Sequence, residues 1–138
     1  MKIKELKMSS VKISSESPFE DIIGFSRAVR VGNLIVISGT APVQPNGLTA
    51  FKDDVYGQTK YCFQIIEKTL KKAGSTLKDI VRTRIMLVKI STWKEAAQAH
   101  GEIFKDIKPA CTFVEISRFI NEEWLVEIEA DGIIAIPN

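Results

Sequence analysis

Cysteine, histidine and long apolar runs are scarce in this chain of 138 residues. Two cysteines, Cys62 and Cys111, lie far apart in the sequence, and His100 is the one histidine. We therefore expect two free thiols in a reducing compartment rather than a disulfide framework. A single histidine without cysteine or carboxylate neighbours at ligand spacing makes no zinc site, so we expect no metal and no cofactor.

Membrane and nucleic-acid signals are also missing. No segment approaches the ~20 apolar residues that a membrane span needs. The first ten residues, MKIKELKMSS, alternate charged and apolar side chains and contain no signal-peptide core. Nineteen basic and seventeen acidic residues leave a net charge of +2, which is too weak to indicate a phosphate-binding surface. We expect a cytoplasmic protein with neither a membrane nor a nucleic-acid partner.

The hydrophobic pattern predicts an α+β fold in one domain that spans residues 1–138. Helical spacing predicts helices over Asp53–Ala73 and Thr92–Ile107, the second opened by a capping box of Thr92 and Glu95. Gly-Asn between two apolar runs predicts a β-hairpin. Ser15–Asp21 is expected to be a loop. The expected strands are Val11–Ser14, Phe25–Val31, Leu34–Ser38, Ile80–Ile90, Cys111–Ser117 and Leu125–Ile136. We predict one mixed sheet with both helices on one face.

The last predicted strand has two chemically different faces. Alternation sends the apolar set one way and the acidic set the other: Val126, Ile128 and Ala130 against Glu127, Glu129 and Asp131. Three carboxylates in a row need water or cations beside them, and Arg82 and Arg84 alternate in the same manner on an earlier strand. Two interpretations stay open. The acidic face is either solvated and salt-bridged, or it meets another subunit and one carboxylate lines a cleft there.

Three segments resemble the RidA/YjgF family, whose members are also described as endoribonuclease L-PSP-like. They are Val31–Thr40 (VGNLIVISGT), Lys108–Thr112 (KPACT) and Leu125–Ala130 (LVEIEA). The resemblance implies a chorismate mutase-like fold and a homotrimer with pockets at the subunit interfaces. It also implies a hydrolase that converts reactive enamines and imines, such as 2-aminoacrylate, to a 2-oxo acid and ammonia.

The resemblance implies a catalytic role for Glu127, which matches the family's water-orienting carboxylate. The implied substrate-binding residues are Ser26, Ser38, Gly39, Thr40, Cys111 and Thr112. Two of these positions depart from the family pattern. Cys111 stands where the family has an arginine that holds the substrate carboxylate, and a thiol cannot replace that charged, bidentate group at neutral pH. The family's pocket tyrosine falls near Ser26.

Each candidate has a structural alternative. Glu127 is a proton shuttle or a salt-bridge partner of Arg82 or Arg84. Cys111 lines the pocket or, with a base beside it, acts as a nucleophile. His100 is expected to be a packing residue of its helix. Either Arg27 or Arg30 is a candidate for the lost cation, and alternation puts the two on opposite faces.

These residues support two functions of different kinds. The first is hydrolysis of an imine or enamine other than the usual 2-imino acid, with Glu127 as the acid–base group. The second is a homotrimer that binds a small-molecule metabolite without turning it over, as the missing arginine suggests. RNA cleavage, a third activity within the family, finds no support here because the basic residues are scattered and the aromatic residues are typical of a core.

Overall fold

The computed structural model describes residues 9–135 of the chain. The alternating N-terminal segment and Ile136, the predicted end of the last strand, lie outside the described residues. Among the described helices, none is long and apolar enough to cross a bilayer. Both cysteine thiols are free, as predicted.

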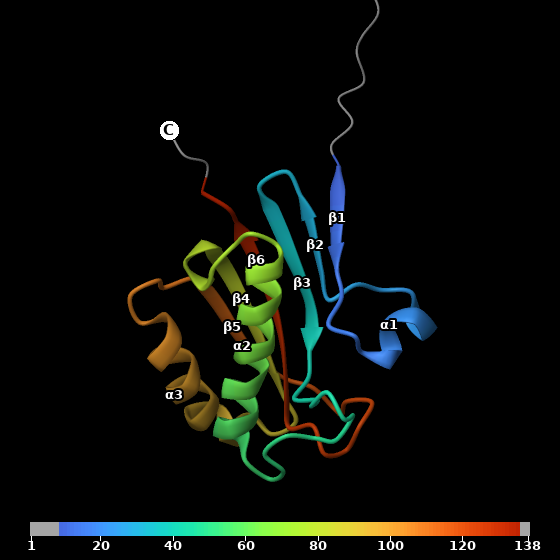
Figure 1. The fold of residues 1–138 in the computed structure, drawn as a ribbon. Helices are drawn as coiled ribbons and strands as arrows, with labels where there is room; N and C mark the ends of the chain where they lie inside the picture. Colours follow the sequence, from blue (N-terminus) through green and yellow to red (C-terminus); the bar gives the residue numbers. More distant parts are fainter. Residues whose placement is uncertain (1–8, 136–138) are drawn as a thin grey trace, which may run out of the picture.

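Six strands form one mixed sheet, which confirms the predicted fold class (Figure 1). Their order across the sheet is β1-β2-β3-β6-β4-β5. β4 and β5 run parallel, and all the other neighbouring strands are antiparallel. The strands are β1 (Ser10–Ile13), β2 (Ala28–Val31), β3 (Leu34–Thr40), β4 (Ile80–Leu87), β5 (Ala110–Glu115) and β6 (Val126–Ile133).

The two long helices, α2 (Val55–Lys72) and α3 (Trp93–Phe104), cover the same face of this sheet (Figure 1). Four apolar side chains of α2 pack in the hydrophobic core against the sheet, namely Cys62, Phe63, Ile66 and Leu70. Each is buried, and each lies on the stripe that helical spacing predicted. Neither α2 nor α3 lies on the opposite face of the sheet (Figure 1). Because Val126, Ile128 and Ala130 of β6 pack in the core, alternation places the acidic residues of β6 on that opposite face.

A short helix replaces the loop predicted over Ser15–Asp21. Helix α1 runs over Pro18–Ile23, with Ser17 as its N-cap and Pro18 in its first turn. The Ser17 hydroxyl accepts a hydrogen bond from the Phe19 N–H, and Glu20 Oε2 accepts one from the Ser17 N–H. The prediction was wrong because Pro18 was interpreted as a helix breaker, although proline is favoured in the first turn of a helix.

The capping box predicted at Thr92 does not form. Residues Ile90–Thr92 make a 3₁₀ turn, and the Thr92 hydroxyl donates to the carbonyl oxygen of Lys89 at 2.6 Å instead of receiving an N–H from α3. A hydroxyl that bonds backward along the chain is not free to cap the helix that follows.

β3 and β6 lose their regular register near the end of the sheet. Ile37 lies opposite Ala130, but Thr40 lies opposite Ile128, so Ser38 and Gly39 together face a single residue of β6. This is the geometry of a β-bulge, which bends a strand and re-aims the side chains around it. The bulge falls at Ser38, Gly39 and Thr40, which the family resemblance implies are substrate-binding residues of the pocket floor.

Candidate active site

Glu127 lies on the uncovered face of the sheet, directly after the start of β6. Along this strand Val126, Ile128 and Ala130 are buried and each acidic residue is half-buried, so the predicted alternation is confirmed. Burial of the Glu127 carboxyl raises its pKa above the ordinary glutamate range, because desolvation penalises the ionised form. Arg27 opposes this rise and Glu129 adds to it, each through its charge. The net result is an acid poised to exchange a proton nearer to neutral pH.

The bulge in β3 gives this carboxyl its space. A Cβ atom added to Gly39 would lie 2.9 Å from Glu127 Oε1, closer than real Cβ atoms approach an oxygen. The absence of a side chain at Gly39 therefore lets the carboxyl lie against the backbone of β3. On the other side of β6, the neighbouring strand β4 places Met86 opposite Glu127, and Met86 carries no charge.

A cavity of about 700 Å³ opens beside this carboxyl. Its walls come from α1, the end of β3, the loop that follows β3, one face of α2 and the segment before β6. Four of the predicted site residues line it, and they are Ser38, Gly39, Thr40 and Glu127. The structure thus brings together the acid and the floor that the family resemblance implied. A volume of this size accommodates a drug-sized ligand.

Arg27 is a buried cation in the wall of this cavity, which Lys68 and Lys72 also line. Its side chain is 7 % exposed, and the structure holds it with hydrogen bonds from Nε to the Ser15 hydroxyl at 3.1 Å and from Nη1 to the Gly39 carbonyl at 2.6 Å. The Arg27 guanidinium carbon also lies 5.2 Å from the centre of the Phe25 ring, in cation–π range. Phe25 and Arg27 both line the cavity, as two residues of alternating backbone do.

Arg30, the other candidate for the missing cation, points elsewhere. Its Nη1 donates to the carbonyl oxygen of Ala73 at 2.6 Å, at the C-terminal end of α2. Its Nε donates to the carbonyl oxygen of Gly32 at 2.9 Å. Positive charge at a helix C-terminus is stabilising. Arg30 therefore caps a helix, and within the chain only Arg27 of the two reaches the cavity.

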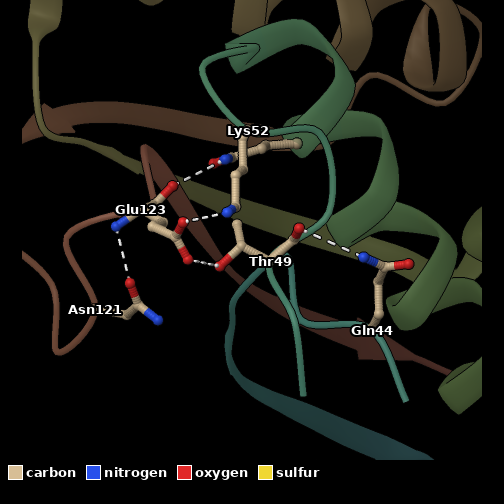
Figure 2. Close-up of polar contacts among 6 residues, drawn as sticks. Gln44, Thr49, Lys52, Asn121 and Glu123 are labelled. Atoms are coloured by element: carbon tan, nitrogen blue, oxygen red, sulfur yellow. Dashed lines mark hydrogen bonds and ion pairs between the residues drawn. The ribbon is translucent and has the colours of Figure 1, made fainter. Parts of the chain in front are cut away.

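A polar cluster ties together the two loops that form the cavity rim (Figure 2). Glu123 Oε2 is 2.9 Å from Lys52 Nζ, and Glu123 Oε1 accepts a hydrogen bond from the Thr49 hydroxyl at 3.1 Å. Figure 2 also shows Gln44 Nε2 donating to the Thr49 carbonyl and the Asn121 side chain accepting from the Glu123 N–H. The loop after β3 is thereby anchored to the segment that precedes β6.

The buried side chain of Trp124, next to Glu123 in the sequence, forms part of the cavity wall. Its ring meets Phe19 of α1 edge to face, with centroids 6.4 Å apart. The buried side chain of Gln58 in α2 bonds both neighbours of Trp124, donating to the carbonyl of Glu123 and accepting from the N–H of Leu125. Sequence reasoning missed Gln58, and the only available signal was a glutamine on the apolar stripe of α2.

Three predicted site residues lie apart from this cavity within the single chain. Cys111 and Thr112 are exposed on β5, the edge strand of the sheet, and are separated from β6 by β4. Ser26 lines a separate shallow depression, although its carbonyl accepts a hydrogen bond from the Ser38 hydroxyl at 2.6 Å. Their roles in a site therefore stay predictions that depend on a neighbouring subunit.

His100 is a packing residue, as predicted. Its ring lies among Phe63, Phe104 and Phe113, and Nε2 is 2.9 Å from the Thr83 hydroxyl. Burial lowers the pKa of His100, because it penalises the charged imidazolium. Cys111 is the register partner of Thr83 on the parallel neighbour strand, so it lies on the face that α3 covers and not on that of Glu127.

The arginines of β4 pair with the other two carboxylates of β6. Arg84 Nη1 is 3.4 Å from Glu129 Oε2, and Arg82 Nε is 3.9 Å from Asp131 Oδ2. All four side chains are partly exposed, so each pair contributes little to stability on its own. Glu127 is in no such ion pair among residues 9–135, which removes the salt-bridge alternative that the sequence left open for it.

The chain is similar in sequence to a known protein family and to several of its members. The family model described as Endoribonuclease L-PSP matches residues 16–134. A RutC family protein from Pyrococcus abyssi is 32% identical over 123 residues, which cover 89% of this chain and 96% of the relative. The 3-aminoacrylate deaminase RutC of Acinetobacter baylyi is 27% identical, over 73% of this chain and 79% of that protein.

A solved structure agrees with the fold at higher identity. The crystal structure of Rv2704 from Mycobacterium tuberculosis, described as a member of the YjgF/YER057c/UK114 family, superposes with a TM-score of 0.83 and is 41% identical. The match covers 91% of this chain and all of that one. The six-stranded sheet with its helices is therefore the architecture of that group.

Proposed function

The chain belongs to the RidA/YjgF family, that of the Endoribonuclease L-PSP model, and on this premise we propose that it hydrolyses the carbon–nitrogen bond of a small imine or enamine at the Glu127 cavity. One observation carries the proposal: an acid with a raised pKa, held in a cavity and free of any ion pair among residues 9–135. A relative of the chain is named as a deaminase of 3-aminoacrylate, itself an enamine.

The reaction needs one group that can both give and take a proton. Protonated Glu127 delivers a proton to the carbon of an enamine, which converts it to the iminium form. The resulting carboxylate then removes a proton from water as the water oxygen attacks the iminium carbon. The same group returns that proton to nitrogen, and the carbon–nitrogen bond breaks as the hydroxyl of the tetrahedral intermediate gives its proton to the Glu127 carboxylate. A carbonyl compound and ammonia leave, and Glu127 is protonated again. A pKa near the working pH suits both directions of transfer.

The second half of the proposal concerns assembly. We propose a homotrimer in which β5 of one subunit brings Cys111 and Thr112 to the cavity of its neighbour, together with Ser26 at the rim. The uncovered sheet face supports this, because it carries exposed apolar residues such as Leu34 and Val36 beside its charged rows. Light scattering should give three times the chain mass of 15.4 kDa, whereas a monomer at micromolar concentration would contradict it.

Turnover is tested with imines and enamines generated in situ, 3-aminoacrylate included, and with ammonia release as the readout. Glu127→Gln should lower kcat by about 100-fold or more, the usual contribution of a positioned acid–base group, and Glu127→Asp should recover part of it. Glu129→Gln is the matched control on the same strand face. Equal rates for wild type and Glu127→Gln on every turned-over substrate would refute the mechanism.

A specific departure favours a second function, a metabolite-binding trimer without turnover. The position of the family's carboxylate-binding arginine is taken by Cys111. A thermal-shift screen against small metabolites separates the two functions, because a ligand that is bound and not consumed raises Tm by mass action and is recovered unchanged.

A further inference from the structure

Glu20 is a buried carboxylate to which the proposed mechanism gives no role. It lies on α1 and is 7 % exposed. Its Oε2 atom accepts three hydrogen bonds, from the N–H and the hydroxyl of Ser15 and from the N–H of Ser17. Burial alone would raise the pKa of Glu20, but the hydrogen bonds from the serines before α1 outweigh it and lower the pKa. The chain therefore keeps a charged carboxylate in its interior at neutral pH, and such a charge needs a cation.

Arg27 is that cation, and a single hydroxyl joins the two groups. Ser15 Oγ donates to Glu20 Oε2 at 2.9 Å and accepts from Arg27 Nε at 3.1 Å. A serine hydroxyl has one donor and two acceptor sites, so it makes both bonds at once. Desolvation lowers the pKa of the Arg27 guanidinium, and among the charges that oppose this fall Glu20 acts most strongly, ahead of Glu127. Glu20 is thus the main counter-charge of Arg27.

The Nη1 end of Arg27 supports the backbone beside Glu127. Arg27 Nη1 donates to the Gly39 carbonyl at 2.6 Å and to the Thr40 hydroxyl at 3.3 Å. Both residues lie at the bulge of β3, and a Cβ atom on Gly39 would be 2.9 Å from Glu127 Oε1. A bulge re-aims the side chains around it, so what holds the bulge also decides where the carboxyl lies. Contacts therefore run without a break from Glu20 on α1 to Glu127 on β6.

No other anion near Arg27 is free to replace Glu20. Arg27 and Glu127 line the same cavity but form no ion pair within residues 9–135. The other ionisable groups around this pair are Cys62, Glu129, Lys68 and Lys72. Burial raises the pKa of the Cys62 thiol and keeps it neutral, Arg84 pairs with Glu129, and the lysines are cations. Without Glu20, the one remaining anion for Arg27 is Glu127.

We propose that Glu20 is a positioning residue for Glu127. Through Ser15 it holds Arg27 and balances its charge, so that the guanidinium supports the bulge of β3 instead of forming an ion pair with Glu127. Glu127 thereby stays free to exchange protons with a substrate. The inference rests on the proposed function for the use made of that freedom, but the coupling between the two glutamates is independent of turnover.

The test measures the NMR titration midpoint of the Glu127 carboxyl carbon. Glu20→Gln keeps the size and an acceptor oxygen but removes the charge. The attraction of Arg27 then goes to Glu127, and the midpoint should fall by about one pH unit, the low end of the effect of a nearby opposite charge. Asp21→Asn, which removes an exposed charge from the same helix, is the matched control. Ser17→Ala removes the cap of α1 and keeps the charge of Glu20. Both controls should titrate like wild type.

A double-mutant cycle tests whether Glu20 acts through Arg27. Arg27→Gln alone should raise the Glu127 midpoint, because it removes a positive charge that stabilises the carboxylate. Adding Glu20→Gln to this variant should change the midpoint little, since residues that act through a shared partner are not additive. A fall as large as that in the wild-type background would show that Glu20 acts without Arg27, and it would overturn the inference.

The outcomes separate this inference from the proposed function. Should Glu127→Gln release ammonia like wild type while the midpoint still depends on Glu20, the mechanism fails and the coupling stands. Should Glu127→Gln abolish turnover while Glu20→Gln titrates like wild type, the mechanism stands and the inference fails. An equal fall of the midpoint in Asp21→Asn also contradicts it, because any charge on α1 would then have the same effect.

Glu20 and Arg27 also support the structure, so a variant that fails to fold needs a replacement measurement. Wild-type protein supplies one in the NMR signal of the Arg27 Nε–Hε group, assigned by its contact with the Phe25 ring. This proton should stay protected from exchange with water on both sides of the Glu127 midpoint, because Ser15 holds it throughout. Loss of protection once Glu127 ionises would show that Arg27 leaves Ser15 for Glu127, and it would overturn the inference.

Discussion

Glu127 and Glu129 lie two residues apart on the same face of one strand, and they meet opposite surroundings. On the neighbouring strand β4, Arg84 lies opposite Glu129 and forms a salt bridge with it, with Arg84 Nη1 3.4 Å from Glu129 Oε2. The residue opposite Glu127 is Met86. On its other side Glu127 has the bare backbone of Gly39 and a cavity. The comparison supports a division of roles within the row. The neighbouring strand holds Glu129 in an ion pair, whereas Glu127 has no such partner and is the proposed acid–base group.

The strongest way to break this comparison is to give Glu127 the partner that Glu129 has. Met86→Arg places a guanidinium opposite Glu127 in the register of the Arg84–Glu129 pair. A cation within ion-pair distance lowers a carboxyl pKa by about 1–3 units, so the rate of ammonia release at neutral pH should fall roughly tenfold or more. Met86→Leu keeps the volume without the charge and should retain activity. An unchanged rate in Met86→Arg would contradict the link between the absent partner and activity.

A smaller effect is expected from filling the space beside Glu127. In Gly39→Ala the new Cβ would lie 2.9 Å from Oε1, at the far end of a flexible side chain. The carboxyl must move while the fold does not, so activity should fall about tenfold with Tm nearly unchanged. Gly101→Ala, whose Cβ would meet nothing within 4 Å, should leave activity intact. A loss of Tm without a loss of rate in Gly39→Ala would assign Gly39 a structural role only.

The pH dependence of stability sharpens the comparison further. The pKa of Glu127 is raised by burial, so the folded chain holds this proton more tightly than the unfolded chain. Its contribution to stability is full in acid, below the ordinary glutamate pKa, and is lost as the pH rises through the raised value. Glu127→Gln should therefore gain Tm over wild type at pH 8 and lose that advantage near pH 4. The reverse trend would show a paired carboxylate.

The smallest effect is expected from removing the ion pair between Arg84 and Glu129. A double-mutant cycle of Arg84→Ala and Glu129→Ala should give a coupling energy of about 0.2–1 kcal/mol in the monomeric state, because both side chains are partly exposed. Urea unfolding supplies the four free energies. A coupling well above this range would show that the row is buried in the assembly.

Local pattern was enough to predict most of the fold. Alternation in β6 placed Glu127 opposite the core, and the matching alternation in β4 identified Arg82 and Arg84 as its cationic row. Several strand ends were placed too far out. The predicted strand Phe25–Val31 is only Ala28–Val31, and Phe25 and Arg27 before it line the cavity.

The parts that could not be predicted depend on contacts between distant segments. Pairing of β6 between β3 and β4 decides that Met86, and not an arginine, lies opposite Glu127. The choice between Arg27 and Arg30 likewise depended on where α2 ends, since the carbonyl of Ala73 takes Arg30 away. Helix α1 was within reach of the sequence, because Ser17 and Glu20 have the spacing of a capping box.

The raised pKa of Glu127 is tested most directly by NMR titration of its carboxyl carbon, with the signal identified by its loss in Glu127→Gln. We expect a midpoint above the ordinary glutamate range, and a fall of that midpoint in Met86→Arg. A midpoint within or below the ordinary range in the wild-type protein would show that the cavity holds an ordinary carboxylate, and the proposed acid–base role would have no basis.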